Sequence, residues 1–510
     1  MSLQTMRWNR RLLLRNLLLG AAAAPLLRAH AGAAPRRHLI NIVVRGGWDS
    51  FWFHNAVRAS EVLGAVATTG ALVVNGAFVQ PPGSSNYRGI LGPARVLSDD
   101  APVGSPFHIR FPDSFSRPHP HQPTALLGPG FSGFLDAELS NFCIWRGIRS
   151  EGGHDTGNRI LQTGTTGDQT SAFPALVAAE LAAKRGLRPL HYTQLATSRM
   201  ELCNQMGPLS LADPVMIPDL GTWENLTAPS AREFSTKRRS LLDATFSRLA
   251  SHQRLRQASN QVAYDSFASS HDGAISLMSS GHAKGQDFVS TLADYRGVLT
   301  ALATSQPMAQ WFPLAKVDVE PLVFRFALAE FLVTHDLAAV VDLPGLTMDF
   351  HTENDSDVMV MLANLTGMQL LVRRLKAAPA PEGGTMLDHT TVVMHTEMER
   401  TPFLMPNHVD PSRAGTGHGD SATSAFLAGV GIAGGRVVGE FARPAGQHTT
   451  AEYGVAPFAP LPIDLATGNA SLAGQLVGVR SLFSTMLQSF GAVSRSQLQL
   501  QAPVVTALLA

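Results

Sequence analysis

Five residues that commonly bind metals stand where strands are expected to end. They are Asp49 after HLINIVVR, Asp349 and His351 in TMDFHTEND, Glu397 after TTVVMH, and His418 in the glycine-rich GTGHG. Carboxylates and imidazoles from separate strand ends suit a divalent cation, because they supply negative charge and leave positions for water or substrate. Each residue alone also fits a structural role, such as Glu397 paired with Arg400. Their joint placement therefore predicts a divalent-metal site.

A second group of reactive residues follows the apolar run FCIWRGI, in the loop RSEGGHDTGN. His154 and Thr156 lie in this loop, just before a helix expected from about Asn158. The start of a helix favours negative charge, because its first N–H groups point outward and its dipole is positive there. Guanidinium groups bind phosphate and sulfate through two oxygens. Arg146, Arg159 and Arg400 are therefore candidates to hold an anion, with structural ion pairing as the alternative for each.

The elements that would position these residues alternate between strands and helices. Short apolar runs predict strands at 38–45, 142–148, 390–395 and 424–430, and longer periodic segments predict helices at 175–185, 324–335 and 357–376. This alternation predicts an α/β fold with a mainly parallel sheet and helices on both faces. We expect one α/β domain over residues 38–500, with a helical insertion at about 225–335.

The first 31 residues have the pattern of an export signal. Arg10 and Arg11 are paired in NRRLLLR, an apolar stretch runs over 17–27, and Ala29-His30-Ala31 resembles a cleavage site. NRRLLLR looks like a twin-arginine signal, and an uncleaved amphipathic helix is the alternative. The stretch is too short and too interrupted by proline for a stable membrane span in the mature chain. We therefore expect the twin-arginine export machinery as a partner and a periplasmic or secreted location.

The charge balance excludes one class of partner. Lys and Arg number 40 against 39 Asp and Glu, which gives a formal net charge of +1. A protein held on nucleic acid by phosphate contacts needs a strong excess of positive charge. We therefore expect no nucleic-acid partner.

Several motifs in fixed order resemble a known family. GGWDS, GHDTGNRILQTG, MDFHTEND, LDHTTVVMHTEMERTP, GTGHGDSATSAFLAG and GGRVVGE resemble the domain-of-unknown-function family 1501 of exported bacterial proteins, which looks related to the alkaline phosphatase and sulfatase superfamily. The resemblance implies a three-layer α/β sandwich with metals at the carboxyl ends of the central strands. It also implies that Asp49 is a first-strand metal aspartate, that Asp349 and His351 share one metal, that Glu397 takes the place of a second-metal aspartate, and that His418 is the final metal histidine.

The chain departs from the superfamily at two positions. Counting back ten residues from Gly164 lands on His154, where relatives carry a nucleophilic hydroxyl or thiol. His154 is then a metal ligand or general acid/base, Thr156 is the nucleophile in a shifted register, or the site binds without turnover. Met398 follows Glu397 where alkaline phosphatases carry a histidine, which favours one metal over two. Zinc, manganese, calcium and magnesium are not distinguished.

These observations lead to two functional hypotheses. The first is an exported metal-dependent hydrolase of phosphate or sulfate esters, with a small anionic ester as substrate. The second is a non-catalytic, metal-stabilised binding or assembly protein on the same fold. The ligand set and the arginine candidates favour the hydrolase, whereas the histidine at the nucleophile position favours the binding protein.

Overall fold

A computed structural model gives the arrangement of the chain. It describes residues 37–48, 50, 53–55, 72–74, 77–79, 117–128, 131, 137–150, 154–166, 172–185, 188–197, 214–227, 281–305, 317–348, 354–406, 414–418, 422–442, 459–491 and 501–510. The predicted signal segment and residues Asp49, Asp349 and His351 lie outside this part of the chain. Only the backbone of His418 is described.

The centre of the molecule is an eight-stranded sheet in the order β14-β6-β13-β10-β1-β9-β7-β8. These strands are β1 (His38–Val44), β6 (Phe142–Arg149), β7 (Tyr192–Gln194), β8 (Val215–Met216), β9 (Val340–Pro344), β10 (Thr390–Thr396), β13 (Ala422–Gly429) and β14 (Arg436–Val438). Only β13 runs antiparallel to its neighbours in this sheet. The predicted α/β fold class with a mainly parallel sheet is confirmed.

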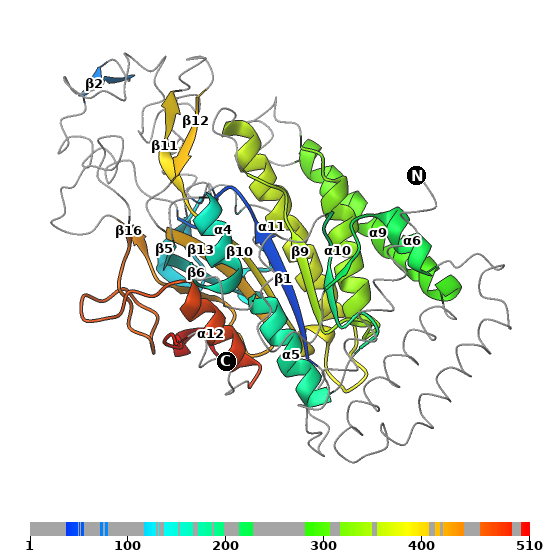
Figure 1. Cartoon of the computed structure of the whole chain (residues 1–510). Coiled ribbons are helices and arrows are strands. Elements are labelled where there is room, and N and C mark those ends of the chain that lie inside the picture. The colour runs from blue at the N-terminus through cyan, green and yellow to red at the C-terminus, as the bar shows by residue number, and fades with distance from the viewer. Residues whose placement is uncertain are drawn as a thin grey trace.

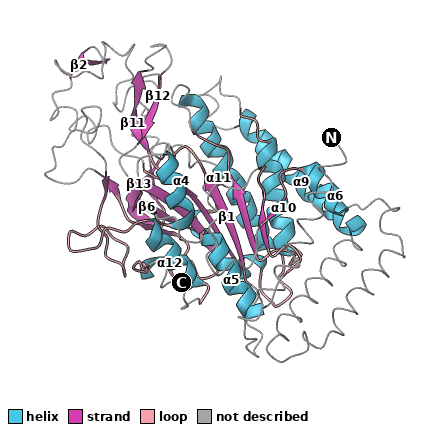
Figure 2. Ribbon diagram, viewed as in Figure 1, coloured by secondary structure: helices cyan, strands magenta, loops and turns pink. Residues whose placement is uncertain are grey.

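Helices cover both faces of the sheet (Figures 1 and 2). One face carries α4 (His154–Thr163), α5 (Phe173–Arg185) and α12 (Val479–Ser489), and the other carries α6 (Leu220–Thr227), α9 (Gly281–Ser305), α10 (Glu320–Thr334) and α11 (Asn354–Ala377). Strand β1 is buried along its whole length. Its apolar side chains alternate between the two cores: Ile40, Ile42 and Val44 join the α10 and α11 side, while Leu39 joins the α5 and α12 side.

The smaller elements lie outside this sheet. They are the strand pairs β2 (Leu72–Val74) with β3 (Ala77–Val79), β4 (Arg117–His119) with β5 (Gln122–Leu127), β11 (Arg400–Pro406) with β12 (Ala414–His418), and β15 (Phe441–Ala442) with β16 (Ala459–Pro460), together with the 3-10 turns η4 (Leu139–Asn141), η7 (Met386–His389) and η8 (Thr506–Leu508). The pair β11–β12 connects β10 to β13. This excursion reverses the chain, and β13 then runs back beside β10.

Two observations bear on the predicted helical insertion and on the expectation of no stable membrane span. Of the predicted insertion at 225–335, the structure describes the end of α6, all of α9 and α10, and the short stretch at 317–319 before α10, so its extent stays a prediction. Among the described residues, the segment Val358–Ala377 of α11 is long and apolar enough to cross a membrane, and 89% of its most apolar window is buried inside the fold.

A row of hydrogen-bonded polar side chains crosses the buried sheet. Asp342 of β9 accepts hydrogen bonds from Asn41 Nδ2 at 2.9 Å, from Gln194 Nε2 at 3.0 Å and from the Tyr192 hydroxyl at 3.4 Å. Asn41 Oδ1 in turn lies 2.9 Å from Nε2 of His395 on β10. Burial raises the pKa of Asp342 to about 6 and lowers that of His395 to about 3. This row therefore holds a carboxyl and a neutral imidazole inside the sheet.

Candidate functional site

Glu397 is the centre of the carboxyl edge of the sheet. It follows the last residue of β10 and is fully buried. Its Oε1 accepts a hydrogen bond from the backbone N–H of Gly46 at 2.9 Å and lies 2.6 Å from Nδ1 of His154. Ser150 Oγ donates to the Glu397 carbonyl at 2.6 Å. The ends of β1, β6 and β10 therefore meet around one buried carboxylate.

His154 is the first residue of α4, one turn earlier than the sequence suggested. An acidic residue follows it directly, which suits the positive end of a helix. Its side chain is 32% exposed, whereas Glu397 has no exposed surface. Because a carboxylate only accepts hydrogen bonds, Nδ1 of His154 is the donor in this contact. The imidazole of His154 is thus partly accessible and oriented by a buried carboxylate.

The loop after β1 is fixed to the segment after β10 by main-chain hydrogen bonds. Trp48 N–H donates to the Met398 carbonyl at 2.9 Å, and Arg400 N–H donates to the Trp48 carbonyl at 2.8 Å. Gly47 has φ +88°, and a Cβ there would lie 2.7 Å from Cγ of Met398. Only glycine permits this close approach. Asp49, which lies outside the described residues, comes directly after the fixed Trp48.

Arg400 connects two further segments. Its guanidinium Nη2 donates to the Met348 carbonyl at 2.8 Å, and Met348 N–H donates to the Arg45 carbonyl at 2.8 Å. Met348 directly precedes Asp349, so the segment that carries Asp349 and His351 leaves from this point. On the other side, Arg400 is paired in backbone register with His418. The structure thus brings the chain neighbours of Asp49, Asp349 and His418 to Glu397 and Arg400.

The remaining predicted site residues are Thr156, Arg146 and Arg159, and each has different surroundings. Thr156 is exposed on the first turn of α4. Arg146 points into the protein, with Nη1 3.4 Å from the His54 carbonyl and Nη2 3.5 Å from the Gly439 carbonyl. Burial lowers its pKa, and the charge of Glu440 partly opposes that shift. Arg159 donates to the Thr166 carbonyl at 3.0 Å. Substrate binding by Arg146 and Arg400, and nucleophilic attack by Thr156, stay predictions.

The predicted metal set is only partly described. Within the described part of the chain, no group of three or more His, Cys, Asp or Glu side chains lies close enough to hold a metal ion. Four of the five predicted ligands have side chains outside that part. The fifth, Glu397, is a buried carboxylate beside an imidazole, which is a donor pair that fits a divalent cation.

Sequence reasoning missed three polar residues behind the loop: His54, Glu399 and Ser424. All three are buried, and Ser424 Oγ donates to Glu399 Oε1. The only signal in the sequence was a second glutamate two residues after Glu397.

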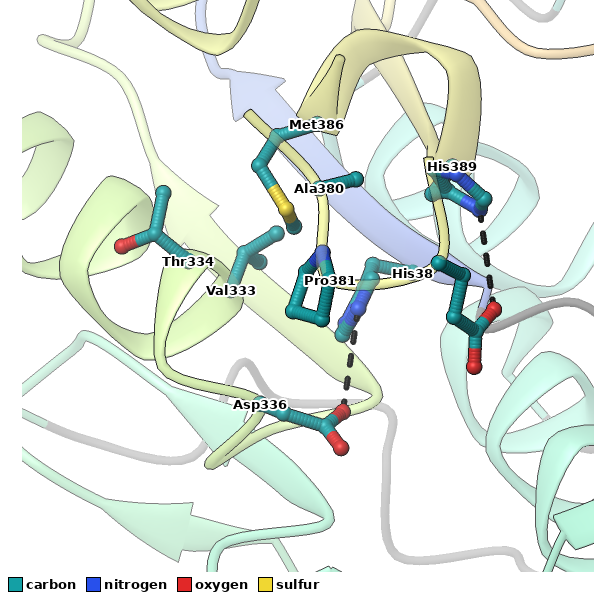
Figure 3. A pocket seen from close by; sticks show the side chains of 9 residues that line it. His38, Val333, Thr334, Asp336, Ala380, Pro381, Met386 and His389 are labelled. Atoms are coloured by element: carbon teal, nitrogen blue, oxygen red, sulfur yellow. Dashed lines mark ion pairs between the residues drawn. The ribbon is translucent and has the colours of Figure 1, made fainter. Parts of the chain in front are cut away.

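A small cavity lies at the opposite, amino edge of the sheet (Figure 3). Its volume is about 10 Å³, and it is lined by His38, Val333, Thr334, Asp336, Ala380, Pro381, Glu382, Met386 and His389. His38 Nε2 lies 3.8 Å from Asp336, and His389 Nδ1 lies 4.0 Å from Glu382. A cavity of this size holds about one water molecule. It is separate from the Glu397 site, because it lies at the start of β1 and β10 rather than at their ends.

Comparison with known proteins supports the family resemblance over part of the chain. Residues 317–459 match the family described as "Protein of unknown function (DUF1501)". This match contains β9, α11, β10 and the Glu397 segment. A comparison with curated proteins found no match.

Among solved structures, the chain is similar to the PsFucS1 sulfatase from Pseudoalteromonas sp. The sequence identity is 8%, the TM-score is 0.35, and the alignment covers 98% of this chain and 77% of the sulfatase.

Proposed function

We propose that the protein is an exported, metal-dependent hydrolase of phosphate or sulfate esters. The observation that carries this proposal is the 2.6 Å contact between His154 Nδ1 and Glu397 Oε1 at the carboxyl edge of the sheet. Ligands and substrates of open α/β sheets bind at this edge. A partly exposed histidine oriented by a buried carboxylate is also a common acid/base arrangement.

The proposed cofactor is one divalent cation. Asp49, Asp349, His351, Glu397 and His418 would hold it, and support comes from the main-chain contacts that tie their neighbouring residues to Glu397 and Arg400. Such a cation supplies Lewis acidity to an ester oxygen and to a water molecule. Several ligands of mixed oxygen and nitrogen type suit zinc or manganese as well as harder cations.

Side chains of the protein would supply proton transfer, an alternative attacking group and anion binding. Nε2 of His154 accepts a proton from the attacking group or returns one to the leaving oxygen, while Glu397 stabilises the imidazolium that forms. Thr156, two residues along α4, is the alternative attacking group. Arg146 and Arg400 are the candidates to bind the anionic oxygens of a small ester.

The remaining parts of the proposal concern delivery. The leader would direct the folded protein to the twin-arginine export machinery and place it in the periplasm or outside the cell. We expect neither a nucleic-acid partner nor a stable span in the mature chain.

A substrate panel tests the proposed function. Purified mature protein is assayed on aryl phosphates, phosphodiesters and aryl sulfates with zinc, manganese, calcium or magnesium. We expect turnover of at least one ester class, dependent on the added metal and strongly reduced in Glu397→Gln. If the protein binds metal but hydrolyses none of these esters, the hydrolase proposal is overturned and the binding protein is favoured.

A further inference from the structure

A second group of buried polar side chains lies behind the Glu397 site. His54, in the turn after Trp48, is 1% exposed, and Glu399 is fully buried. His54 Nε2 lies 3.8 Å from Glu399 Oε1. The His54 ring packs nearly perpendicular to the rings of Trp48 and Phe426, with centroids 5.5 and 4.9 Å apart. The pair is therefore enclosed between aromatic side chains and the start of β13.

This group leaves several buried polar atoms without hydrogen bonds. Among the described residues, neither ring nitrogen of His54 has a hydrogen-bond partner, and Oε2 of Glu399 has none. Asn55, next to His54, also leaves its buried Oδ1 without one. A buried polar atom left unsatisfied costs about 1–3 kcal/mol. Several such atoms in one place indicate a bound species that supplies their missing partners.

The charge balance indicates that this species is a cation. A buried carboxylate without a counter-charge is strongly destabilising, and the described residues give Glu399 no Lys or Arg ion pair. Arg146 lies near His54, but the hydrogen bonds of its guanidinium go to the His54 and Gly439 carbonyls. A protonated His54 would be expected within about 2.7–2.9 Å of the carboxylate, not at 3.8 Å.

We propose that His54 and Glu399 are ligands of a divalent cation distinct from the one at Glu397. Two ligand bonds of about 2.0–2.2 Å, set about 110–120° apart, place their donor atoms about 3.3–3.8 Å from each other. The separation of His54 Nε2 and Glu399 Oε1 lies at the upper end of this range. Ser424 Oγ donates to Glu399 Oε1, as outer residues do when they orient a metal-binding carboxylate. The buried Oδ1 atom of Asn55, the residue after His54, is a candidate further ligand.

The two positions are separate, and their residue types suggest a borderline metal. Glu397 and His154 do not join His54 and Glu399 in a single group of metal-binding dimensions. An imidazole nitrogen together with carboxylate and amide oxygens suits zinc or manganese rather than a soft metal. The cation would fix the turn at residues 53–55 to the segment after β10. This inference does not depend on whether the protein is a hydrolase.

Metal counting on the full mature chain tests the site. Protein loaded with zinc and dialysed is analysed for bound zinc as the wild type, Glu399→Gln, His54→Gln and Asp349→Ala/His351→Ala. We expect Glu399→Gln and His54→Gln each to lose one equivalent that Asp349→Ala/His351→Ala retains. Ser481→Ala is the matched control, because it removes a buried hydroxyl on α12, outside the proposed site, and should keep that equivalent. Unchanged zinc in both Glu399→Gln and His54→Gln would overturn the proposal.

A spectroscopic measurement tests the site in a protein that keeps both His54 and Glu399, so it does not depend on the folding of their variants. Cobalt is bound to Asp349→Ala/His351→Ala, whose His54 and Glu399 are intact, and its X-ray absorption is recorded. We expect one imidazole in the first coordination shell. Cobalt with oxygen ligands only, or no retained cobalt, would contradict the site even if the Glu399 and His54 variants failed to fold.

Discussion

Nδ1 of His154 lies 2.6 Å from Oε1 of Glu397, although 243 residues separate them in the chain. Gly46 N–H donates to the same oxygen, so the carboxylate joins the loops after β1, β6 and β10. One strong contact thus fixes the orientation of the imidazole that faces solvent. The relationship makes His154, rather than a hydroxyl, the first residue to test for chemistry.

Replacing His154 should distinguish two mechanisms, one with His154 as the acid or base and one with Thr156 as the nucleophile. We expect His154→Ala to lower kcat by about 10²–10⁴, the usual contribution of a positioned acid or base. Thr156→Val is the control, since that side chain is exposed on the first turn of α4. Steady-state kinetics on the best ester of the panel gives both values. Loss of activity in Thr156→Val with full activity in His154→Ala would assign the attack to Thr156 instead.

Gly47→Ala should damage the site through the backbone. The residue has φ +88°, and an added Cβ would lie 2.7 Å from Met398 Cγ and 3.1 Å from its carbonyl oxygen. We expect a loss of about 1–3 kcal/mol in the free energy of unfolding, with weaker metal binding because Asp49 lies two residues on. Urea unfolding and zinc titration measure the two effects. Gly383→Ala is a matched control, because its φ is +97° but its Cβ would meet no atom within 4 Å. Equal losses of stability in both variants would show that the positive φ causes the effect, and not the close approach to Met398.

The central strands could be predicted because their local pattern determines them. The run at 38–45 is apolar on both faces, and the observed β1 ends one residue earlier. The direction of β13 could not be predicted, since its reversal depends on the β11–β12 excursion rather than on its own residues. The alternation of strands and helices predicted a mainly parallel sheet, but it carried no information about this one reversal.

Glu397 could be predicted from the sequence as a site residue, whereas the buried pair of His54 and Glu399 could not. Glu397 follows a clear apolar strand, and strand ends are where ligands gather. Its contact with His154 is made by loops, whose conformations no periodic pattern specifies. His54 and Glu399 meet only through tertiary packing against Phe426. Asp342 was similarly hidden, because a single acidic residue within VVDLP does not change the reading of a buried strand.

Asp342 should make stability fall as pH rises. Its pKa is raised to about 6 in the folded protein, mainly by burial, while hydrogen bonds from Asn41, Gln194 and Tyr192 act in the opposite direction. The unfolded value is about 3.9, so between about pH 4 and 6 the folded state binds more protons than the unfolded state. The free energy of unfolding then decreases through this window, by on the order of 3 kcal/mol in total.

Asp342→Asn should remove this component. Other titrating groups are common to both proteins, so the difference between variant and wild type isolates Asp342. Relative to the wild type, the free energy of unfolding of Asp342→Asn should increase by up to about 1.4 kcal/mol per pH unit between pH 4 and 6. Above pH 7 the difference between the two proteins should be constant. Urea unfolding at several pH values measures it. Parallel curves for the two proteins across this range would contradict a raised pKa.

Arg400→Lys should show whether the guanidinium holds the Asp349 segment. Arg400 is fully buried, and its Nη2 donates to the Met348 carbonyl at 2.8 Å. Lysine keeps the charge but has a single terminal nitrogen on a differently shaped side chain, so it cannot reproduce a planar guanidinium. We expect a loss of about 1–3 kcal/mol in the free energy of unfolding, together with weaker zinc binding, because Asp349 directly follows Met348. Arg296→Lys is the matched control: Arg296 is 48% exposed and pairs with exposed Glu320, so its replacement should change stability by less than about 1 kcal/mol. Wild-type zinc affinity in a destabilised Arg400→Lys would show that Arg400 supports the fold without positioning the metal ligands.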